Sequence, residues 1–146
     1  MGLDCYIVHG NDRSKDFTHK DDPRIKDVNL CGGMFSGFGA DGSFRGKFYE
    51  PLIDDLMEDE YIWHLEADDE LAHVTAQELK EQADALADLL HAVESDAKHL
   101  EQTLEPETIV YKTDRMEAEY TYQEIQDLEL LLRCASERGA VMTVWW

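Results

Sequence analysis

The sequence predicts an α+β protein, in which a mainly antiparallel sheet carries two substantial helices on one face, together with a short helix and a glycine-rich hairpin. Three observations support this class. Two capping boxes each precede an apolar repeat of helical period, β-branched and aromatic runs flank these repeats, and an Asp-Gly pair lies within a glycine-rich stretch. With 146 residues, 43% of them hydrophobic, the chain can form one compact domain over residues 1–146.

The elements expected before the first long helix are short. Residues 3–10 (LDCYIVHG) predict a strand, because β-branched and aromatic side chains predominate there. Residues 11–29 show no period, many charges and a proline, and they predict a long connection of the kind that is often mobile or functional. Residues 51–60 predict a short helix with Pro51 in its first turn. Residues 61–65 (YIWHL) predict a further strand.

Two capping boxes mark the long helices. Thr75 precedes Glu78 by three residues, and Thr121 precedes Glu124 by the same spacing, so each pair can satisfy amides at a helix start. Gly139 is well placed to end the second helix. Apolar residues behind the first box recur in alternating steps of four and three, the spacing of a helix that packs along a seam. They are Leu79, Ala83, Leu86, Leu90, Val93, Ala97, Leu100 and Leu104.

Strands are predicted on both sides of the second helix. Residues 107–113 (ETIVYKT) predict one, and residues 140–146 (AVMTVWW) predict a final strand that is apolar on both faces and therefore covered on both sides. Consecutive strand residues point to opposite faces. Trp145 and Trp146 are therefore either both buried between layers, or one of them is exposed and marks a contact with a partner.

The first helix is long for a domain of this size. From its cap to Leu104 it would span about 30 residues, or about 45 Å, whereas the compact chain has a diameter of roughly 35–40 Å. The helix therefore either breaks near residues 94–98 or projects beyond the domain. A projecting end would expose Leu100 and Leu104, and we expect a second copy of the chain to cover this interaction surface in a homodimer.

The glycine-rich stretch GFGADGSFRGK predicts a hairpin rather than a nucleotide site. Gly37, Gly39 and Gly42 match the G-x-G-x-x-G fingerprint, but that motif must lie between a strand and a helix, and the following SFRGKFY has no helical period. Asp41-Gly42 is a favoured two-residue hairpin turn. In the resulting register Gly37 would face Gly46 and Phe35 would face Phe48.

A small basic spot follows from the same hairpin. Arg45 and Lys47 would share one face, because strand side chains alternate. They either pair with neighbouring carboxylates such as Glu50, or they form an anion site together with Gly37, Gly39 and Gly42. Within the histidines and cysteines we find no convincing catalytic or metal-binding pattern, so the sequence predicts no catalytic residue, no metal site and no cofactor.

The net charge restricts the class of partner. The chain has 33 acidic and 13 basic residues and a formal charge of -20. Such a surface repels nucleic acid and anionic membranes, so neither is expected as a partner. The excess charge is consistent with solubility, with a salty habitat or with attraction to a basic protein.

The expected compartment is the cytoplasm. Three widely spaced cysteines do not suggest a disulfide framework, no signal peptide is evident, and no apolar run reaches the ~18 residues of a membrane span. The leading hypothesis is thus a non-enzymatic interaction module that binds or inhibits a basic partner. The alternative is a small-ligand or anion-binding protein or enzyme that uses residues 32–46 with Arg45 and Lys47.

Overall fold

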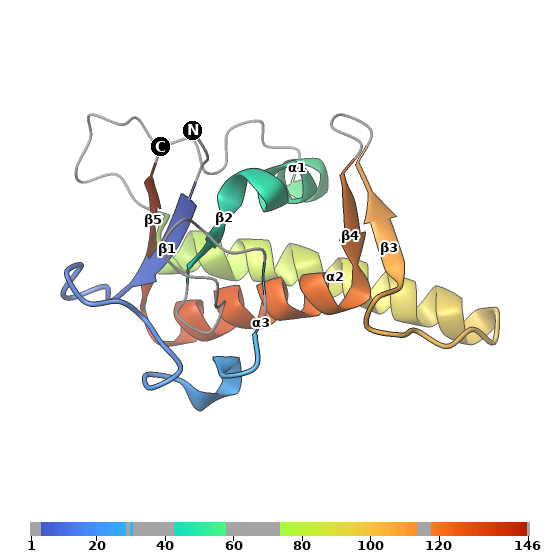
Figure 1. The fold of residues 1–146 in the computed structure, drawn as a ribbon, viewed down its shortest axis with the longest axis horizontal. Coiled ribbons are helices and arrows are strands. Elements are labelled where there is room, and N and C mark those ends of the chain that lie inside the picture. Colours follow the sequence, from blue (N-terminus) through green and yellow to red (C-terminus); the bar gives the residue numbers. More distant parts are fainter. Residues whose placement is uncertain (1–3, 29, 31–42, 58–73, 114–117, 146) are drawn as a thin grey trace.

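The computed structural model describes residues 4–28, 30, 43–57, 74–113 and 118–145 (Figure 1). It confirms the α+β class, with two long helices packed against each other and strands that pair in the antiparallel sense. The elements in chain order are β1 (Asp4–Val8), the 3-10 turn η1 (Pro23–Ile25), β2 (Ser43–Arg45), α1 (Gly46–Met57), α2 (Ala76–His99), β3 (Ile109–Lys112), β4 (Glu119–Thr121), α3 (Tyr122–Glu137) and β5 (Val141–Trp145).

The strands form two small sheets rather than a single one. One sheet has the order β2-β1-β5 and the other pairs β3 with β4, and they lie at opposite ends of the α2–α3 pair (Figure 1). The length of α2 explains this separation. Its 24 residues carry the chain about 36 Å away from β1. There β3 can pair only locally, with β4, and α3 then returns the chain so that β5 pairs with β1.

Both predicted capping boxes are confirmed. The Thr75 hydroxyl accepts from the Glu78 amide at 3.2 Å, and the Glu78 carboxylate accepts from the Thr75 amide at 3.2 Å. The same reciprocal pair joins Thr121 and Glu124 at the start of α3. Beyond the caps, the apolar faces of the two helices are buried against each other and against the sheets. The members of this core from α2 and α3 are Leu79, Ala83, Leu86, Leu90, Ile125, Leu128, Leu131, Leu132, Cys134 and Ala135.

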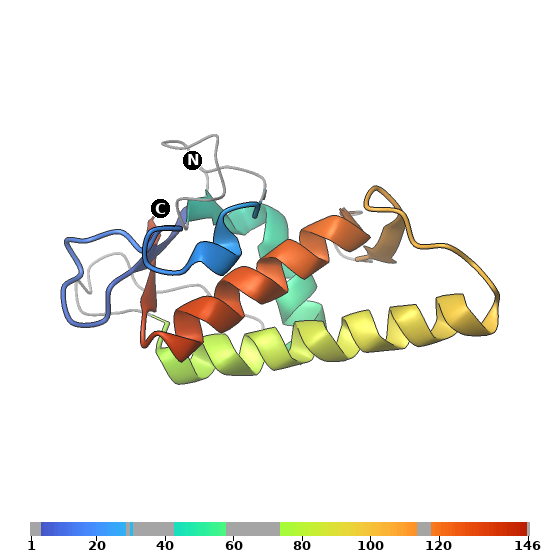
Figure 2. The same ribbon diagram turned by 90° about the horizontal axis from the view of Figure 1, so that it is seen from below.

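Of the two alternatives for the long helix, the structure shows no break near residues 94–98, because α2 continues to His99. The helix then ends in a Schellman motif, in which the Gln102 amide donates to Ala97 at 2.7 Å and the Glu101 amide donates to Lys98 at 3.2 Å. Glu101 occupies the left-handed position, with φ of 54°. The last turns of α2 extend past α3, and the chain returns from this end toward β3 (Figure 2).

The conformation of Glu101 can be tested, because a non-glycine residue is less stable than glycine at positive φ. Replacing Glu101 with glycine should raise the free energy of unfolding by about 0.5–1 kcal/mol, measured by denaturant titration. Gln102→Gly provides the matched control, because Glu101 is the only described non-glycine residue with positive φ. The control should lower stability through unfolded-state entropy. A loss of stability in both variants would contradict this account of the cap.

The predicted glycine-rich hairpin is wrong in its second strand. Only Ser43–Arg45 form a strand, β2, and they pair with β1. The helix α1 begins at Gly46, five residues before the expected start, so Gly46 and Phe48 cannot face Gly37 and Phe35 across a hairpin. Residues 31–42, including the proposed turn, lie outside the described residues, as does the strand expected at 61–65.

Packing explains why α1 begins early. Phe48 and Tyr49 extend the four-residue repeat of Leu52 and Ile53 by one turn, and they meet Tyr120 of β4 in edge-to-face and tilted contacts at 5.3 and 6.0 Å between ring centroids. The Tyr120 hydroxyl donates to the Phe48 carbonyl. Burial raises the pKa of Tyr120 above its usual range. The aromatic contacts stabilise helix across residues whose glycine and aromatic composition indicated a strand.

Residues 9–28, which follow β1, are anchored to the core rather than being only a solvated connection. Phe17, Ile25 and Val28 are buried. The Phe17 amide donates to the Ile7 carbonyl at 2.9 Å, which holds the start of the segment beside β1. Its charged residues are therefore displayed from a supported backbone, below the sheet in Figure 1.

Candidate functional sites

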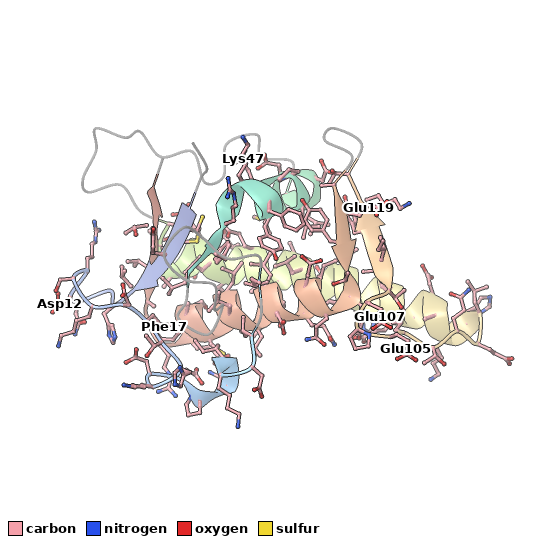
Figure 3. The ribbon with its side chains drawn as sticks, in the orientation of Figure 1. Asp12, Phe17, Lys47, Glu105, Glu107 and Glu119 are labelled. Carbon is pink, nitrogen blue, oxygen red and sulfur yellow. The ribbon has the colours of Figure 1, made fainter. Side chains whose placement is uncertain are left out.

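The structure places the two cations of the predicted basic spot in different elements. Arg45 ends β2 and Lys47 lies in the first turn of α1, so the strand alternation from which their shared face was predicted is absent. Both side chains are exposed, and neither forms an ion pair with another described residue. Figure 3 shows Lys47 pointing away from the helix pair. Gly37, Gly39 and Gly42 lie outside the described residues, so their part in an anion site stays a prediction.

The end of α2 places apolar side chains in solvent. We call residues 94–109, from the last turns of α2 to the start of β3, the tip. Leu100 is 61% exposed and Ile109 is 46% exposed, and they are the large hydrophobic residues most open to solvent in the described part of the chain. Leu104 is half-buried and Ala97 is buried. The tip therefore exposes two apolar side chains rather than the whole end of the predicted seam.

Carboxylates surround these apolar positions. Between residues 94 and 107 the chain carries five acidic residues and one lysine, a formal charge of -4 with histidine neutral. The Tyr122 hydroxyl donates to Glu94, and burial together with this contact raises the pKa of Tyr122 to about 12. Glu105 and Glu107 project from the loop beside α2 in Figure 3. The four carboxylates other than Glu94 form no ion pair with another described residue.

The other candidate interaction residues, at the C-terminus, can be placed only in part. The backbone of Trp145 belongs to β5 and pairs with Asp4. The Trp145 side chain and all of Trp146 lie outside the described residues. Their contribution to an interaction surface stays a prediction.

A pocket of about 430 Å³ lies where the segment after β1 meets the end of α3. Its lining residues are His9, Gly10, Asn11, Phe17, Asp21, Arg138, Gly139 and Ala140. The His9 Nε2 atom lies 3.2 Å from the Asp21 carboxylate, which also accepts from the Thr18 amide at 2.9 Å. The His9 ring meets Phe17 edge-on, with centroids 6.3 Å apart. The lining contains no hydroxyl or thiol group, so it offers the His9–Asp21 pair no side-chain nucleophile.

A buried carboxylate supports one wall of this pocket. Asp22 is 1% exposed and receives two hydrogen bonds from the Arg24 guanidinium to its Oδ2 atom, at 3.2 and 2.7 Å. Arg138 Nε lies 3.4 Å from the same oxygen, and Arg24 also reaches Glu137 at 2.7 Å. The hydrogen bonds from Arg24 hold the pKa of Asp22 well below its usual range. This network joins the charged segment to the end of α3.

Sequence reasoning missed this pocket. Its lining residues come from positions about 120 apart in the chain, and they meet because β5 pairs with β1 directly after α3 ends. The available signals were Gly10, just after the first strand, and Gly139, just after the second helix. In the structure Gly139 has φ of 69°, and the backbone of Gly139 lies against Gly10.

Other site chemistries find little support in the described residues. No group of three His, Cys, Asp or Glu side chains there could hold a metal ion. Cys5 and Cys134 are buried free thiols, as expected for Cys134, and burial followed by the charge of Asp22 raises the pKa of Cys134 to about 11. A thiol with that pKa is a poor nucleophile at neutral pH. Within the described residues, no helix has both the length and the apolar composition that a membrane span needs.

Comparisons of the chain with protein-family models, with curated proteins and with solved structures find no match.

Proposed function

We propose that this protein is a non-enzymatic, cytoplasmic interaction module that binds a basic protein through the tip. One observation carries the proposal: Leu100 and Ile109 are exposed within a projecting region whose formal charge is -4. Protein interfaces combine a few apolar anchors with a charged or polar rim. Exposed apolar side chains on a projecting end are costly in water unless a partner covers them.

Charge favours a basic partner over a second copy of the chain. The carboxylates of the tip would attract lysine- and arginine-rich surfaces and raise the association rate. In a homodimer through the same region, each tip would bring four unpaired carboxylates toward those of its partner. The predicted homodimer through Leu100 and Leu104 is therefore the secondary proposal, and sedimentation of the protein alone tests it.

The decisive change is Leu100→Asp, used as bait beside the wild-type protein. We expect the wild type to retain a basic protein at low salt, to release it at 0.5 M salt, and to lose at least tenfold in affinity on Leu100→Asp when that protein is purified and titrated. An interface anchor supplies about 2 kcal/mol or more, which corresponds to a factor of about 30 and so exceeds this tenfold threshold. Screening at high salt weakens the carboxylate contribution.

Gln77→Glu is the matched control, because it adds the same charge to the exposed surface at the other end of α2. It should leave affinity unchanged or slightly increased. Equal loss in both variants would mean that Leu100 is not an anchor, and binding that survives 0.5 M salt would argue against the charged rim. A wild-type dimer in sedimentation that Leu100→Asp dissociates would replace the basic partner by a second copy.

The alternative function, anion or small-ligand binding through residues 32–46 with Arg45 and Lys47, has weaker support. The two cations are exposed near the start of α1, but they do not share a strand face. Their double alanine variant is nevertheless informative, and it serves below as a comparator for a different anion site.

A further inference from the structure

We propose that the pocket between the segment after β1 and the end of α3 binds a small ligand with an oxyanion head group, a phosphate or a carboxylate. This site is separate from the tip and does not depend on a protein partner. The volume of about 430 Å³ falls within the range of roughly 300–1,000 Å³ that ligand pockets occupy. The pocket can thus hold a metabolite-sized molecule rather than a bare ion alone.

Arg138 is the principal cation at this site. Its Nε atom faces the buried Asp22 carboxylate at 3.4 Å, while its side chain remains 53% exposed. The Arg138 guanidinium bonds to no other acceptor among the described residues, so both Nη atoms remain for a ligand. A guanidinium held from behind by a carboxylate is oriented before the ligand arrives, and its planar fork suits a carboxylate or phosphate.

Two residues of the same lining, Gly10 and Asn11, also carry backbone donors. The amides of Gly10 and Asn11 form no hydrogen bond with any described residue. Neither Gly10 nor Gly139 has a side chain to fill the pocket, so a head group can approach the main chain closely. Successive free amides are a common means of holding an anion.

The His9–Asp21 pair adds a directional group. Asp21 lies 3.2 Å from Nε2, so Nδ1 is the polar atom of the ring that remains for a ligand. A ring nitrogen of histidine can donate or accept a hydrogen bond, so this atom suits a ligand with a further polar group beside its oxyanion.

The charge of the segment beside the pocket is more favourable to an anion than the average of the chain. Residues 9–26 contain five Lys or Arg and four Asp, so this segment has a formal charge of +1, while the rest of the chain carries -21. Asp22 is already paired with Arg24 and with Arg138. An anion that approaches the pocket thus meets less repulsion than over most of this strongly acidic protein.

The test uses the full chain with inorganic phosphate and with acetate, each against chloride at equal ionic strength. We expect one or both to raise the melting temperature of the wild type. The larger response identifies the head group, phosphate or carboxylate. In Arg138→Gln the affinity should fall about tenfold or more, as expected for the loss of charged hydrogen bonds.

Arg24→Gln is the matched control, because it removes a stronger partner of Asp22 but lies outside the pocket lining. It should keep the ligand response even if it is less stable. A response retained in Arg138→Gln but lost in the Arg45→Ala/Lys47→Ala double variant would overturn the proposal and move the anion to α1. An equal rise in melting temperature in every variant would show only general stabilisation by salt, and it would also overturn the proposal.

A measurement on the wild type alone tests the proposal even if the variants misfold. In a titration followed by amide NMR, the Gly10 and Asn11 signals should show saturable shifts among the largest in the protein. Absence of shifts at these two amides, or no response to either anion, would overturn the proposal. Arg138→Lys keeps the charge but not the fork, and it should bind with intermediate affinity.

Discussion

Replacing Gly10 with alanine is expected to lower the free energy of unfolding by about 3 kcal/mol, or the melting temperature by roughly 10 °C. A methyl group at Gly10 would lie 2.2 Å from the Gly139 carbonyl oxygen. That oxygen belongs to the main chain at the α3–β5 junction, so it cannot move aside as a flexible side chain could. To remove this clash, β1 would have to shift relative to the end of α3, and both elements belong to the core.

Gly139→Ala is the natural comparison, because the two glycines touch but are constrained differently. A methyl group at Gly139 meets no atom within 4 Å, so its cost is conformational and comes from φ of 69°. We expect about 1–2 kcal/mol for that change. Thermal melts of both variants decide the matter. Equal destabilisation, or a milder effect at Gly10, would show that the close approach does not govern this junction.

The second large effect is expected from Asp22→Asn, which keeps the shape of the side chain but removes its charge. We predict a loss of about 2–3 kcal/mol at neutral pH, since a buried carboxylate bonded to guanidinium groups contributes about this much. The cost stays below that of a fully buried ion pair, because Arg24 and Arg138 are about half exposed and can turn to water.

The pH dependence gives the same residue an independent test. The pKa of Asp22 is lowered in the folded state, mainly by hydrogen bonds from Arg24. Its contribution is therefore complete above the unfolded pKa of about 3.9 and is lost as pH falls toward the folded value. Wild-type stability should decline over this acid range more steeply than that of Asp22→Asn. The two curves should converge at the lowest pH.

Asp27→Asn supplies the control for this acid range, because Asp27 is an exposed carboxylate in the same segment. Its effect should stay within about 0.5 kcal/mol and should leave the slope of stability against pH unchanged. Identical acid unfolding of wild type and Asp22→Asn would assign the acid sensitivity to other carboxylates. The buried network would then have no special part in stability.

Local signals in this sequence were reliable where the interactions are themselves local. A capping box is completed within four residues, so Thr75–Glu78 and Thr121–Glu124 predicted the starts of α2 and α3. Gly139 likewise predicted the end of α3, because the left-handed position follows from the residue itself. The strands predicted at residues 3–10 and 107–113 contain β1 and β3 for the same reason, because β-branched and aromatic side chains favour an extended backbone over a few residues.

Predictions failed where a distant partner outweighed the local preference. Phe48 and Tyr49 were expected in a hairpin strand, but contact with Tyr120, some seventy residues away, places them in α1. That change puts Arg45 and Lys47 in different elements and removes the strand register from which their shared face was predicted. Of the interaction residues, Leu100 is exposed as expected, whereas the chain that follows α2 leaves Leu104 half-buried.

The sequence by itself determined the α+β class, the two capped helices, the buried apolar face of α2 and the strong negative charge. These follow from composition and from contacts within one or two helical turns. Only the tertiary structure decided which ends meet. The length of α2 separates two small sheets, and the return of α3 brings Arg138 and Gly139 against His9 and Gly10. No periodic pattern in the sequence predicts this contact. The contact depends on the summed geometry of whole elements rather than on any short stretch of residues.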